Sequence, residues 1–474
     1  MAYDREYLET VHDNYKKLTQ QWEFLVRSYY GGKEYKLGNY LHQYNLELDN
    51  EYDLRLDSTP LDNHCRNVVQ VYSSFLFRQP PKRDLGNFSK DESVKAFMTD
   101  ADLDGRDLDT LMKDASTYSM IYGNCWLFVD KPTTNVGTRA EELKQDIRPY
   151  VSIVTPENVT NWNYERLPNG KYDLTEVVVR EDINKEGTIY RVWKKDLISL
   201  CLLPDKGESI TLEELPNKLG KIPAVILYNQ RSPSRYIGLS SLVDVAELQQ
   251  SIYNELSEIE QLIRLTNHPS LVKTDSVEAS AGAGSVVLMP DDLDPNLKPY
   301  QLQPSGASLD SVMNSVKEKV SAIDRISHLG AVRTIRETPT SGIALRTEFN
   351  MLNSKLSEQA DLLQLAEEQI WDLYADWQDI VFDGDIEYPN NFDIRDYAGD
   401  LDFFQKAKLA SVKSETFNKE VDKLIAGAVV QDEEVLHEIN TQIDEQAVLI
   451  GEFEAEKVET PAEEVEEEVV KEEE

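Results

Sequence analysis

The chain of 474 residues is long enough for a large hydrophobic core and for more than one structural region. It carries 87 acidic and 49 basic residues, a formal net charge of -38, so its composition shows no basic patch of the kind that grips nucleic acid. Three scattered cysteines without a CxxC pair argue against a disulfide framework and against a structural zinc site.

The N-terminus, from Met1 to Glu6, has no hydrophobic signal region, and no apolar run approaches the roughly 18 residues needed to span a bilayer. We therefore expect a protein that is made and kept in a cytosol-like compartment. Cys65, Cys125 and Cys201 are expected to be buried free thiols, because each lies within an apolar pattern.

The first part of the chain is predicted to be helical. The expected helices span residues 4 to 30, about 60 to 79 and about 107 to 118. Gly31-Gly32 predicts the end of the first helix, and Pro60 and Pro80 bound the second. Residues 33 to 57 are polar and tyrosine-rich and show no steady period.

From about residue 120 to 230 the pattern changes to strands. The expected strands span residues 125 to 129, 150 to 154, 159 to 164, 175 to 179, 189 to 193, 197 to 203 and 224 to 228. Asn169-Gly170 predicts a hairpin turn, since both positions tolerate positive φ. We expect a mostly antiparallel sheet layer with helices before and after it.

Two long helical patterns follow, separated by a segment rich in glycine and proline. The first begins after Gly238 and meets no proline until Pro269, so it allows about 29 residues, or roughly 43 Å. The second carries apolar residues at helical spacing from Leu309 to Ile326. A helix, an intervening segment and a returning helix predict a projecting pair of helices with a separate element at its end.

The remaining chain is predicted to be largely helical. A polar loop from Arg333 to Pro339 precedes a third helix of about 40 residues that starts near Ser341. The later elements expected are a β-like piece at 385 to 392, helices at 400 to about 424 and at 433 to 453, and a disordered acidic tail. The stretch from Glu452 to Glu474 has twelve glutamates against two lysines, and removing its net charge of -10 still leaves about -28.

No catalytic constellation stands out. The phosphate-loop, HExxH and GxSxG patterns are missing, and the six histidines never pair at metal-ligand spacing. Asp291-Asp292-Leu293-Asp294 is either a solvated acidic loop, which we favour, or a site for a hard cation. We predict a protein that is not an enzyme and that uses no cofactor and no metal.

Several local patterns occur in an order and at spacings that resemble a known family. They are Tyr52 to Leu56, Asn63 to Val69, Phe75 to Pro81, Ile222 to Val225, Gly238 to Ser240 with Tyr253-Asn254, and Thr340 to Leu345. Together, over about residues 4 to 450, they resemble the portal proteins of tailed bacteriophages, the head-to-tail connector ring through which DNA enters and leaves the capsid.

The resemblance implies an α+β, portal-type fold with long stem helices, an antiparallel β-rich wing, a short clip and a helical C-terminal crown. The implied regions are 1-235 wing, 236-268 stem helix 1, 269-305 clip, 306-329 stem helix 2, 330-341 channel loop, 342-399 long wing helix and β piece, 400-453 crown and 454-474 disordered acidic tail.

The resemblance also suggests candidate site residues. Those facing DNA in the channel loop are Arg333, Thr334, Arg336, Thr338, Pro339 and Thr340, and those lining the channel on the stem are Lys317, Lys319 and Arg325. The clip residues that would dock the packaging terminase or the adaptor are Leu271, Val272, Val286, Val287, Leu288 and Met289. Two alternatives stay open: the basic residues could pair with carboxylates between subunits, and the clip edges could pair subunit with subunit.

The function implied is that of a virion structural protein at one capsid vertex, present in the host cytoplasm during assembly. It would form a homo-oligomeric ring, usually of twelve subunits, for genome packaging and ejection. Its partners would be the major capsid protein, the terminase large subunit, head-tail adaptor or tail proteins and double-stranded DNA without sequence specificity, and no membrane. The alternatives are an intracellular α+β enzyme that uses carboxylates around the 120-230 sheet, and another virion structural or scaffold protein.

Overall fold

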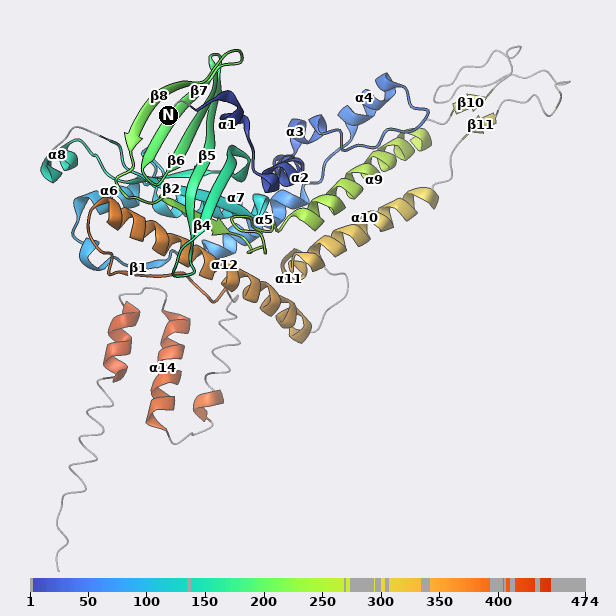
Figure 1. Cartoon of the computed structure of the whole chain (residues 1–474). Coiled ribbons are helices and arrows are strands. Elements are labelled where there is room, and N and C mark those ends of the chain that lie inside the picture. The colour runs from blue at the N-terminus through green and yellow to red at the C-terminus, as the bar shows by residue number, and fades with distance from the viewer. Residues whose placement is uncertain are drawn as a thin grey trace, which may run out of the picture. The chain divides into compact units, whose positions relative to one another are not determined.

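The computed structural model describes residues 3-133, 138-267, 270-272, 294, 300-302, 307-333, 342-392, 404, 406-409, 414-430 and 435-444 (Figure 1). The chain divides into two compact units, Met1–Phe392 and Asp393–Glu474. We call the first unit the body, together with the two-helix arm that projects from it.

The body begins with helices that surround a shared apolar core. They are α1 (Arg5–Glu9), α2 (Asp13–Tyr30), α3 (Gly32–Leu37), α4 (Asp49–Ser58), α5 (His64–Leu76), α6 (Glu92–Thr99), α7 (Leu108–Tyr122) and α8 (Arg139–Lys144), with the 3-10 turns η1 (Gly86–Phe88) and η2 (Pro156–Asn158). The later helices are α9 (Val243–Asn267), α10 (Ala307–Ile326), α11 (Gly330–Arg333) and α12 (Gly342–Trp377).

Within the described residues, the strands form two larger antiparallel sheets and two short pairs. They are β1 (Lys82–Asp84), β2 (Asn124–Asp130), β3 (Tyr150–Val154), β4 (Val159–Arg166), β5 (Tyr172–Asn184), β6 (Gly187–Lys194), β7 (Leu197–Leu203), β8 (Ile210–Pro216), β9 (Ala224–Tyr228), β10 (Ser270–Val272), β11 (Tyr300–Leu302) and β12 (Asp385–Glu387). The sheet orders are β3-β2-β9, β4-β5-β6-β7-β8, β1-β12 and β10-β11. The chain is therefore α+β, as predicted.

The three-stranded sheet lies in the centre of the core. Its middle strand, β2, is buried from Asn124 to Val129, because α7 and α12 pack against it. A strand with both faces covered needs apolar residues without alternation, which explains the run Cys125-Trp126-Leu127-Phe128-Val129. Its neighbours run antiparallel, with Leu127 opposite Ile153 on one side and Val225 on the other.

The five-stranded sheet is an antiparallel meander whose middle part is covered on both faces. Trp162, Val177 and Trp193 pack into the main core, while Val178 and Val192 pack beneath the N-terminal segment around α1. Asn169-Gly170 forms the β4–β5 turn as predicted, with Gly170 at a φ of +85°. The prediction of one sheet layer was wrong, because these strands form a sheet separate from β3-β2-β9.

Sequence patterns missed several elements. Strand β8 is an edge strand with exposed residues on both faces, so it lacks the apolar signature of the strands that were predicted. Helices α3 and α4 form within the polar stretch 33-57. The helix expected at 4-30 is two helices, because α2 starts anew at its N-cap His12, whose Nδ1 accepts a hydrogen bond from the Asn14 N–H at 3.2 Å.

Helix α12 confirms the prediction of a third, very long helix. Its 36 residues span about 54 Å, and it packs against β2, β9 and α5. Leu352, Leu356, Leu363, Ile370 and Tyr374 are buried along one side. All three cysteines are free and buried, as expected. Among the described residues, no helix is both long and apolar enough to cross a membrane.

The second unit is helical where the structure describes it. Helix α14 (Glu415–Val429) begins at Ser414, whose hydroxyl accepts a hydrogen bond from the Phe417 N–H, and residues 435-444 form a further helix. Val421 is buried, whereas Leu424 and Val429 on the same helix are exposed. This unit therefore leaves apolar side chains uncovered within one chain. The tail predicted to be disordered lies outside the described residues.

Candidate functional site: the two-helix arm

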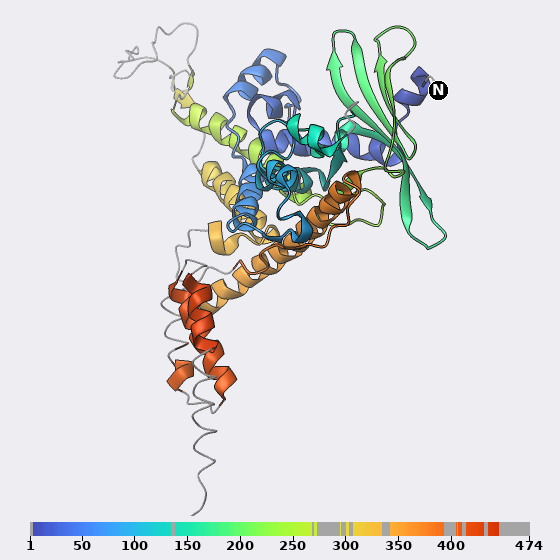
Figure 2. The same ribbon diagram turned by 90° about the vertical axis from the view of Figure 1, so that its left-hand side faces the viewer.

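Helices α9 and α10 lie side by side and form an arm with the β10-β11 pair (Figures 1 and 2). They correspond to the two long helical patterns of the sequence. β10 and β11 pair antiparallel, with Leu271 opposite Gln301. The excursion between the helices therefore begins and ends in a short ladder.

The inner end of the arm is fixed by a close approach of two glycines. A Cβ on Gly238, which leads into α9, would lie 1.8 Å from the carbonyl oxygen of Gly123. Gly123 ends α7 in the left-handed conformation, with a φ of +98°. The Gly238 N–H also donates to the Asn124 Oδ1 at 3.1 Å. This backbone contact leaves no room for a side chain at the start of the arm.

Replacing Gly238 with alanine should lower the free energy of unfolding of the body by on the order of 1–3 kcal/mol, because the added methyl group meets backbone atoms that have to move. Urea unfolding of the purified protein measures the change. Gly427→Ala is the matched control, because its Cβ would meet nothing within 4 Å and the substitution should leave the unfolding of the body unchanged. An equal stability of Gly238→Ala and the parent would contradict this packing.

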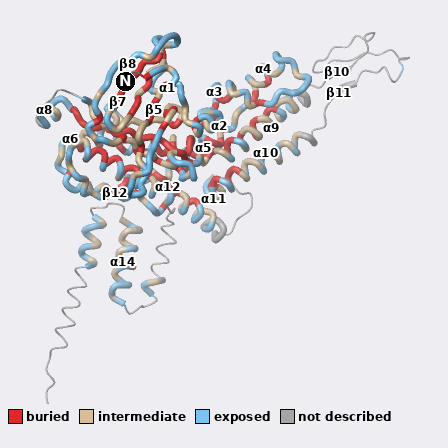
Figure 3. Tube along the Cα trace, in the orientation of Figure 1, coloured by how far each residue is buried: buried red, intermediate tan, exposed pale blue. Residues whose placement is uncertain are grey.

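Apolar side chains of the arm are buried where they face the body and partly exposed elsewhere. On α9, Leu242 and Val245 are buried in the core, whereas Ile263 is exposed. On α10, Ile323 is buried near the body, whereas Met313, farther out, and Ile326, at the inner end, are both 44% exposed. In Figure 3 the buried stretches of both helices lie toward the body. Both helices therefore keep some apolar side chains that the described residues leave partly uncovered.

The predicted stem residues separate into two groups. The ammonium group of Lys319 pairs with Glu255 of α9, and Ser315 donates to the same carboxylate at 2.7 Å. Lys317 and Arg325 are exposed on α10. Lys319 therefore links α10 to α9 within one chain, whereas the charges of Lys317 and Arg325 are exposed on the surface of α10.

The channel-loop and clip residues are described only in part. Arg333 is the last residue of α11, so the expected loop begins with a short helix; Thr334, Arg336, Thr338, Pro339 and Thr340 lie outside the described residues. Leu271 and Val272 lie in β10, whereas Val286, Val287, Leu288 and Met289 lie outside the described residues. Of the possible cation loop at 291-294, the structure describes Asp294 alone.

A cleft of about 520 Å³ lies beside the end of β2, in the sheet region where an enzyme would use carboxylates. Burial raises the pKa of Asp130, which receives a hydrogen bond from the Tyr150 hydroxyl at 3.3 Å. Arg191 lies 4.0 Å from Asp130 and also pairs with Glu181. These groups largely satisfy one another, and none is paired with a nucleophile. The prediction that the protein is not an enzyme stays a prediction.

The sequence also places Asp100, Asp102 and Asp104 before Gly105, a spacing that matches the start of a calcium-binding loop. In the fold, Asp100 accepts from the Gly105 N–H at 2.9 Å, and Asp102 accepts from the Asp104 N–H and pairs with Arg106. In the part of the chain that the structure describes, no group of three or more histidine, cysteine or acidic side chains is placed to hold a metal ion.

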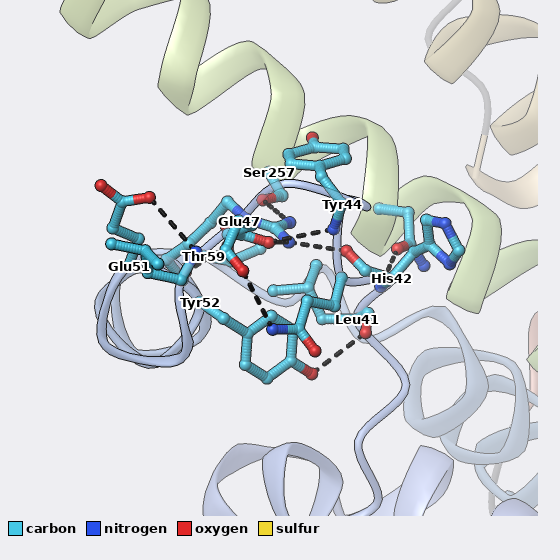
Figure 4. Close-up of polar contacts among 12 residues, drawn as sticks. Leu41, His42, Tyr44, Glu47, Glu51, Tyr52, Thr59 and Ser257 are labelled. Carbon is cyan, nitrogen blue, oxygen red and sulfur yellow. Dashed lines mark hydrogen bonds and ion pairs between the residues drawn. The ribbon is translucent and has the colours of Figure 1, made fainter.

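A polar cluster beside the arm is built around Arg55 of α4 and includes Tyr44, Glu47 and Ser257, which Figure 4 labels. Its guanidinium donates to both carboxylate oxygens of Glu47 at 2.6 Å and to the Ser257 hydroxyl of α9 at 3.0 Å. The rings of Tyr44 and Tyr52 lie 4.3 and 5.5 Å from the guanidinium carbon. The hydrogen bond from Arg55 lowers the pKa of Glu47, and the same bond raises the pKa of Arg55.

This Arg55 cluster ties α4 to the side of α9. The His42 N–H donates to the Asn254 Oδ1 at 2.7 Å, and the Asn254 amide donates to the Tyr40 carbonyl at 3.0 Å. Sequence reasoning singled out Tyr52 to Leu56 as a pattern without assigning it a role. Only the fold shows that Arg55 forms its ion pair within the chain, with Glu47.

No protein-family model and no curated protein matches the chain. Among solved structures, one similar chain belongs to the neck of an empty GTA particle computed with C6 symmetry. The similarity covers 81% of this chain and 95% of that chain, at 9% sequence identity and a TM-score of 0.44.

Proposed function

We propose that the chain is the subunit of a portal-type ring at a phage capsid vertex, through which double-stranded DNA is packaged and ejected. The observation that carries the proposal is the arm, two long paired helices that project from an α+β body. The order of local sequence patterns supports the same assignment. In this proposal, α9 and α10 are the stem and the β10-β11 end is the clip.

Simple geometry is compatible with such a ring. Helices packed side by side lie roughly 8–10 Å apart, so twelve inner helices give a circumference of about 110 Å and a centre-line diameter of about 35 Å. Subtracting a helix radius of about 5 Å on each side leaves a bore of roughly 25 Å, wide enough for duplex DNA.

The acidic composition suits a channel through which DNA slides. Each phosphate contact with lysine or arginine adds salt-dependent affinity, so a wall with few such contacts avoids holding the duplex. With a net charge of -38, the chain provides a generally repelling surface. Transient contacts with the DNA backbone fall to a few basic residues, with Arg333 and Arg336 first, and require no base recognition.

The proposed partners follow from the same role. The body would sit in the capsid vertex against the major capsid protein, and the clip end would meet the terminase large subunit and later a head-tail adaptor or tail protein. The protein would be non-enzymatic, since the ATPase activity belongs to the terminase. It would be found in the host cytoplasm during assembly and in the virion afterwards.

The mass of the purified assembly tests the ring. Twelve copies of the 54.2 kDa chain should give a particle of about 650 kDa by native mass spectrometry. A stable monomer or dimer over the whole range of concentrations would contradict the proposal and would favour the enzyme alternative.

Replacing both Arg333 and Arg336 with glutamate should leave ring assembly intact and reduce packaged DNA several-fold, because the substitutions add repulsion where the proposal places the DNA backbone. Nuclease-protected DNA per particle is the measurement. Lys171→Glu with Lys206→Glu makes the same change in charge at exposed positions in the loops that join strands of the five-stranded sheet, and it should package normally. Normal packaging by the arginine variant would remove both residues from the DNA contacts.

A further inference from the structure

The part of the chain that contains β9 and the loop after it carries no acidic residue. From Leu215 to Val243 the sequence has neither aspartate nor glutamate, and this is the longest such stretch in a chain with 87 of them. The loop that leads from β9 to the arm also carries two arginines, Arg231 and Arg235, and both are exposed. A loop with arginines and without carboxylates forms a positive surface on an otherwise acidic chain.

A third exposed arginine reaches the same surface from the β4–β5 hairpin. The register of the hairpin places Arg166 opposite Tyr172. The guanidinium carbon of Arg166 lies 5.8 Å from the centre of the Tyr172 ring, and the guanidinium carbon of Arg235 lies 3.2 Å from the same point. Two arginines from separate segments of the chain therefore share one tyrosine ring.

Arg231 belongs to the same group through Tyr228. Its guanidinium carbon lies 5.4 Å from the centre of the Tyr228 ring. Burial raises the pKa of Tyr228, and the positive charges of Arg231 and Arg235 oppose that rise, so both charges act on one hydroxyl group. We call the surface formed by Arg166, Arg231 and Arg235 the arginine patch.

The acidic residues of the hairpin do not neutralise the arginine patch. Side chains alternate between the two faces of a strand, so Glu165 and Asp173, which lie opposite one another, face away from Arg166. Both carboxylates pair with Lys195, at 2.7 and 2.6 Å. Among the described residues, none of the three arginines of the patch forms an ion pair.

The tyrosine rings hold the guanidinium groups without neutralising them. A guanidinium stacked on an aromatic face keeps its charge and its N–H donors, and its planar fork fits the oxygens of a phosphate group. Tyr164 and Tyr172, whose ring centres lie 5.8 Å apart, are 41% and 38% exposed on this hairpin. Arginine and tyrosine side chains are among those that contact the phosphates and sugars of DNA.

We propose that the arginine patch binds the sugar–phosphate backbone of duplex DNA, without base recognition. The overall charge of -38 repels a polyanion, so DNA that touches the body meets its attractive contact at this patch. The choice of DNA among polyanions rests on the proposed function, in which DNA passes the protein. The patch is made by a single chain, so it binds DNA whether or not the ring forms.

Fluorescence anisotropy of a labelled DNA duplex, titrated with the full-length protein, tests the proposal. With a duplex of about 30 base pairs at about 50 mM salt, we expect a dissociation constant on the order of 10 µM, as for other non-specific binding. Three phosphate contacts should give a slope of about -3 for the logarithm of the binding constant against that of the salt concentration. A parent protein that does not bind the duplex at low salt would overturn the proposal.

Replacing all three arginines of the patch with alanine should weaken binding about tenfold or more and bring the salt slope close to zero. The matched control removes the same charge from exposed lysines elsewhere on the body, Lys90, Lys185 and Lys206, and should bind DNA like the parent. Equal binding by the alanine variant and this control would overturn the proposal.

Replacing the same three arginines with lysine separates charge from folding. This variant keeps the positive charges and loses the stacking on the rings, so it should keep the salt slope and lose no more than about fivefold in affinity. Thermal unfolding like that of the parent checks that both variants are folded. A folded lysine variant that binds as weakly as the alanine variant would contradict binding through charge.

Poly-glutamate separates DNA from an acidic protein partner. Added at the same concentration of charge, it should displace the labelled duplex far less than unlabelled duplex does, and equal displacement would overturn the proposal in favour of a protein partner. DNA binding through the patch by a protein that never forms rings would contradict the proposed function and leave this inference standing. Rings whose patch binds no DNA would do the reverse.

Discussion

Replacing Glu367 with alanine is expected to lower the free energy of unfolding of the body by about 3–5 kcal/mol. Glu367 lies on α12 and is fully buried. Its carboxylate accepts from Arg83 at 2.5 Å, from the Tyr388 hydroxyl at 2.6 Å and from the Trp371 indole N–H at 3.2 Å. The substitution removes the shared acceptor of three buried donors at once.

The charge of Arg83 makes this loss larger than that of a neutral hydrogen bond. Burial disfavours the charged guanidinium, yet the hydrogen bonds and charge of Glu367 hold the pKa of Arg83 above its usual value. Without Glu367, the ion pair that remains to Arg83 among the described residues is the one with Asp109, at 2.7 Å, and Asp109 is half exposed. An incompletely paired buried charge is what destabilises such variants.

Urea unfolding of the Glu367→Ala protein measures this effect, with Glu358→Ala as its control on the same helix. Glu358 is 54% exposed and pairs with Lys355 one turn away, so its loss should cost at most about 0.5 kcal/mol. A cost below about 1 kcal/mol for Glu367→Ala would show that the buried cluster contributes little to the body.

Replacing Arg55 with alanine is the second large change, with an expected loss of about 2–4 kcal/mol. The substitution leaves the carboxylate of Glu47, which is largely buried, without its bidentate partner, and it removes the hydrogen bond to Ser257 of α9. The segment 39-61 should then separate from α9, which limited proteolysis would detect. Arg139→Ala is the control, because its pair with Asp91 is 42% exposed on the arginine side and should cost no more than about 1 kcal/mol.

The pH dependence of this loss has a definite sign. The hydrogen bond from Arg55 lowers the pKa of Glu47 in the folded state, from an ordinary value of 4.5. Stability from such a carboxylate is fully present above the unfolded pKa and is lost as the pH falls through the lowered folded pKa. The difference between wild type and Arg55→Ala should therefore be constant near pH 7 and shrink below about pH 4.5. A difference that grew on acidification would contradict the role of Glu47.

Sequence patterns predicted the buried strands and missed the exposed ones. Strands β3, β7 and β9 match the predicted ranges because their apolar residues mark both their ends. β8 was missed because Ile210 and Leu212 are exposed and no buried apolar residue of the strand follows them in an alternating pattern. Edge strands of this kind carry little apolar signal. The division into two sheets depends on hydrogen-bond partners, which a one-dimensional pattern does not contain.

The arm could be predicted from helical spacing, whereas the partners of its side chains could not. Leu242, Val245 and Ile323 are buried as their spacing suggests. Lys319 was a candidate for the channel wall, and only the packing of α10 on α9 brings it to Glu255. The sequence does not distinguish Arg55 and Glu367 from the other charged residues, which number 136 in all. Burial and not residue type sets these two apart.

Image averaging of the purified protein by electron microscopy tests the central claim most directly. The proposed function predicts end-on views with about twelve-fold symmetry around an open bore of roughly 25 Å, and side views in which the paired helices form a narrow stem. Compact particles without a central hole would contradict the portal-type ring.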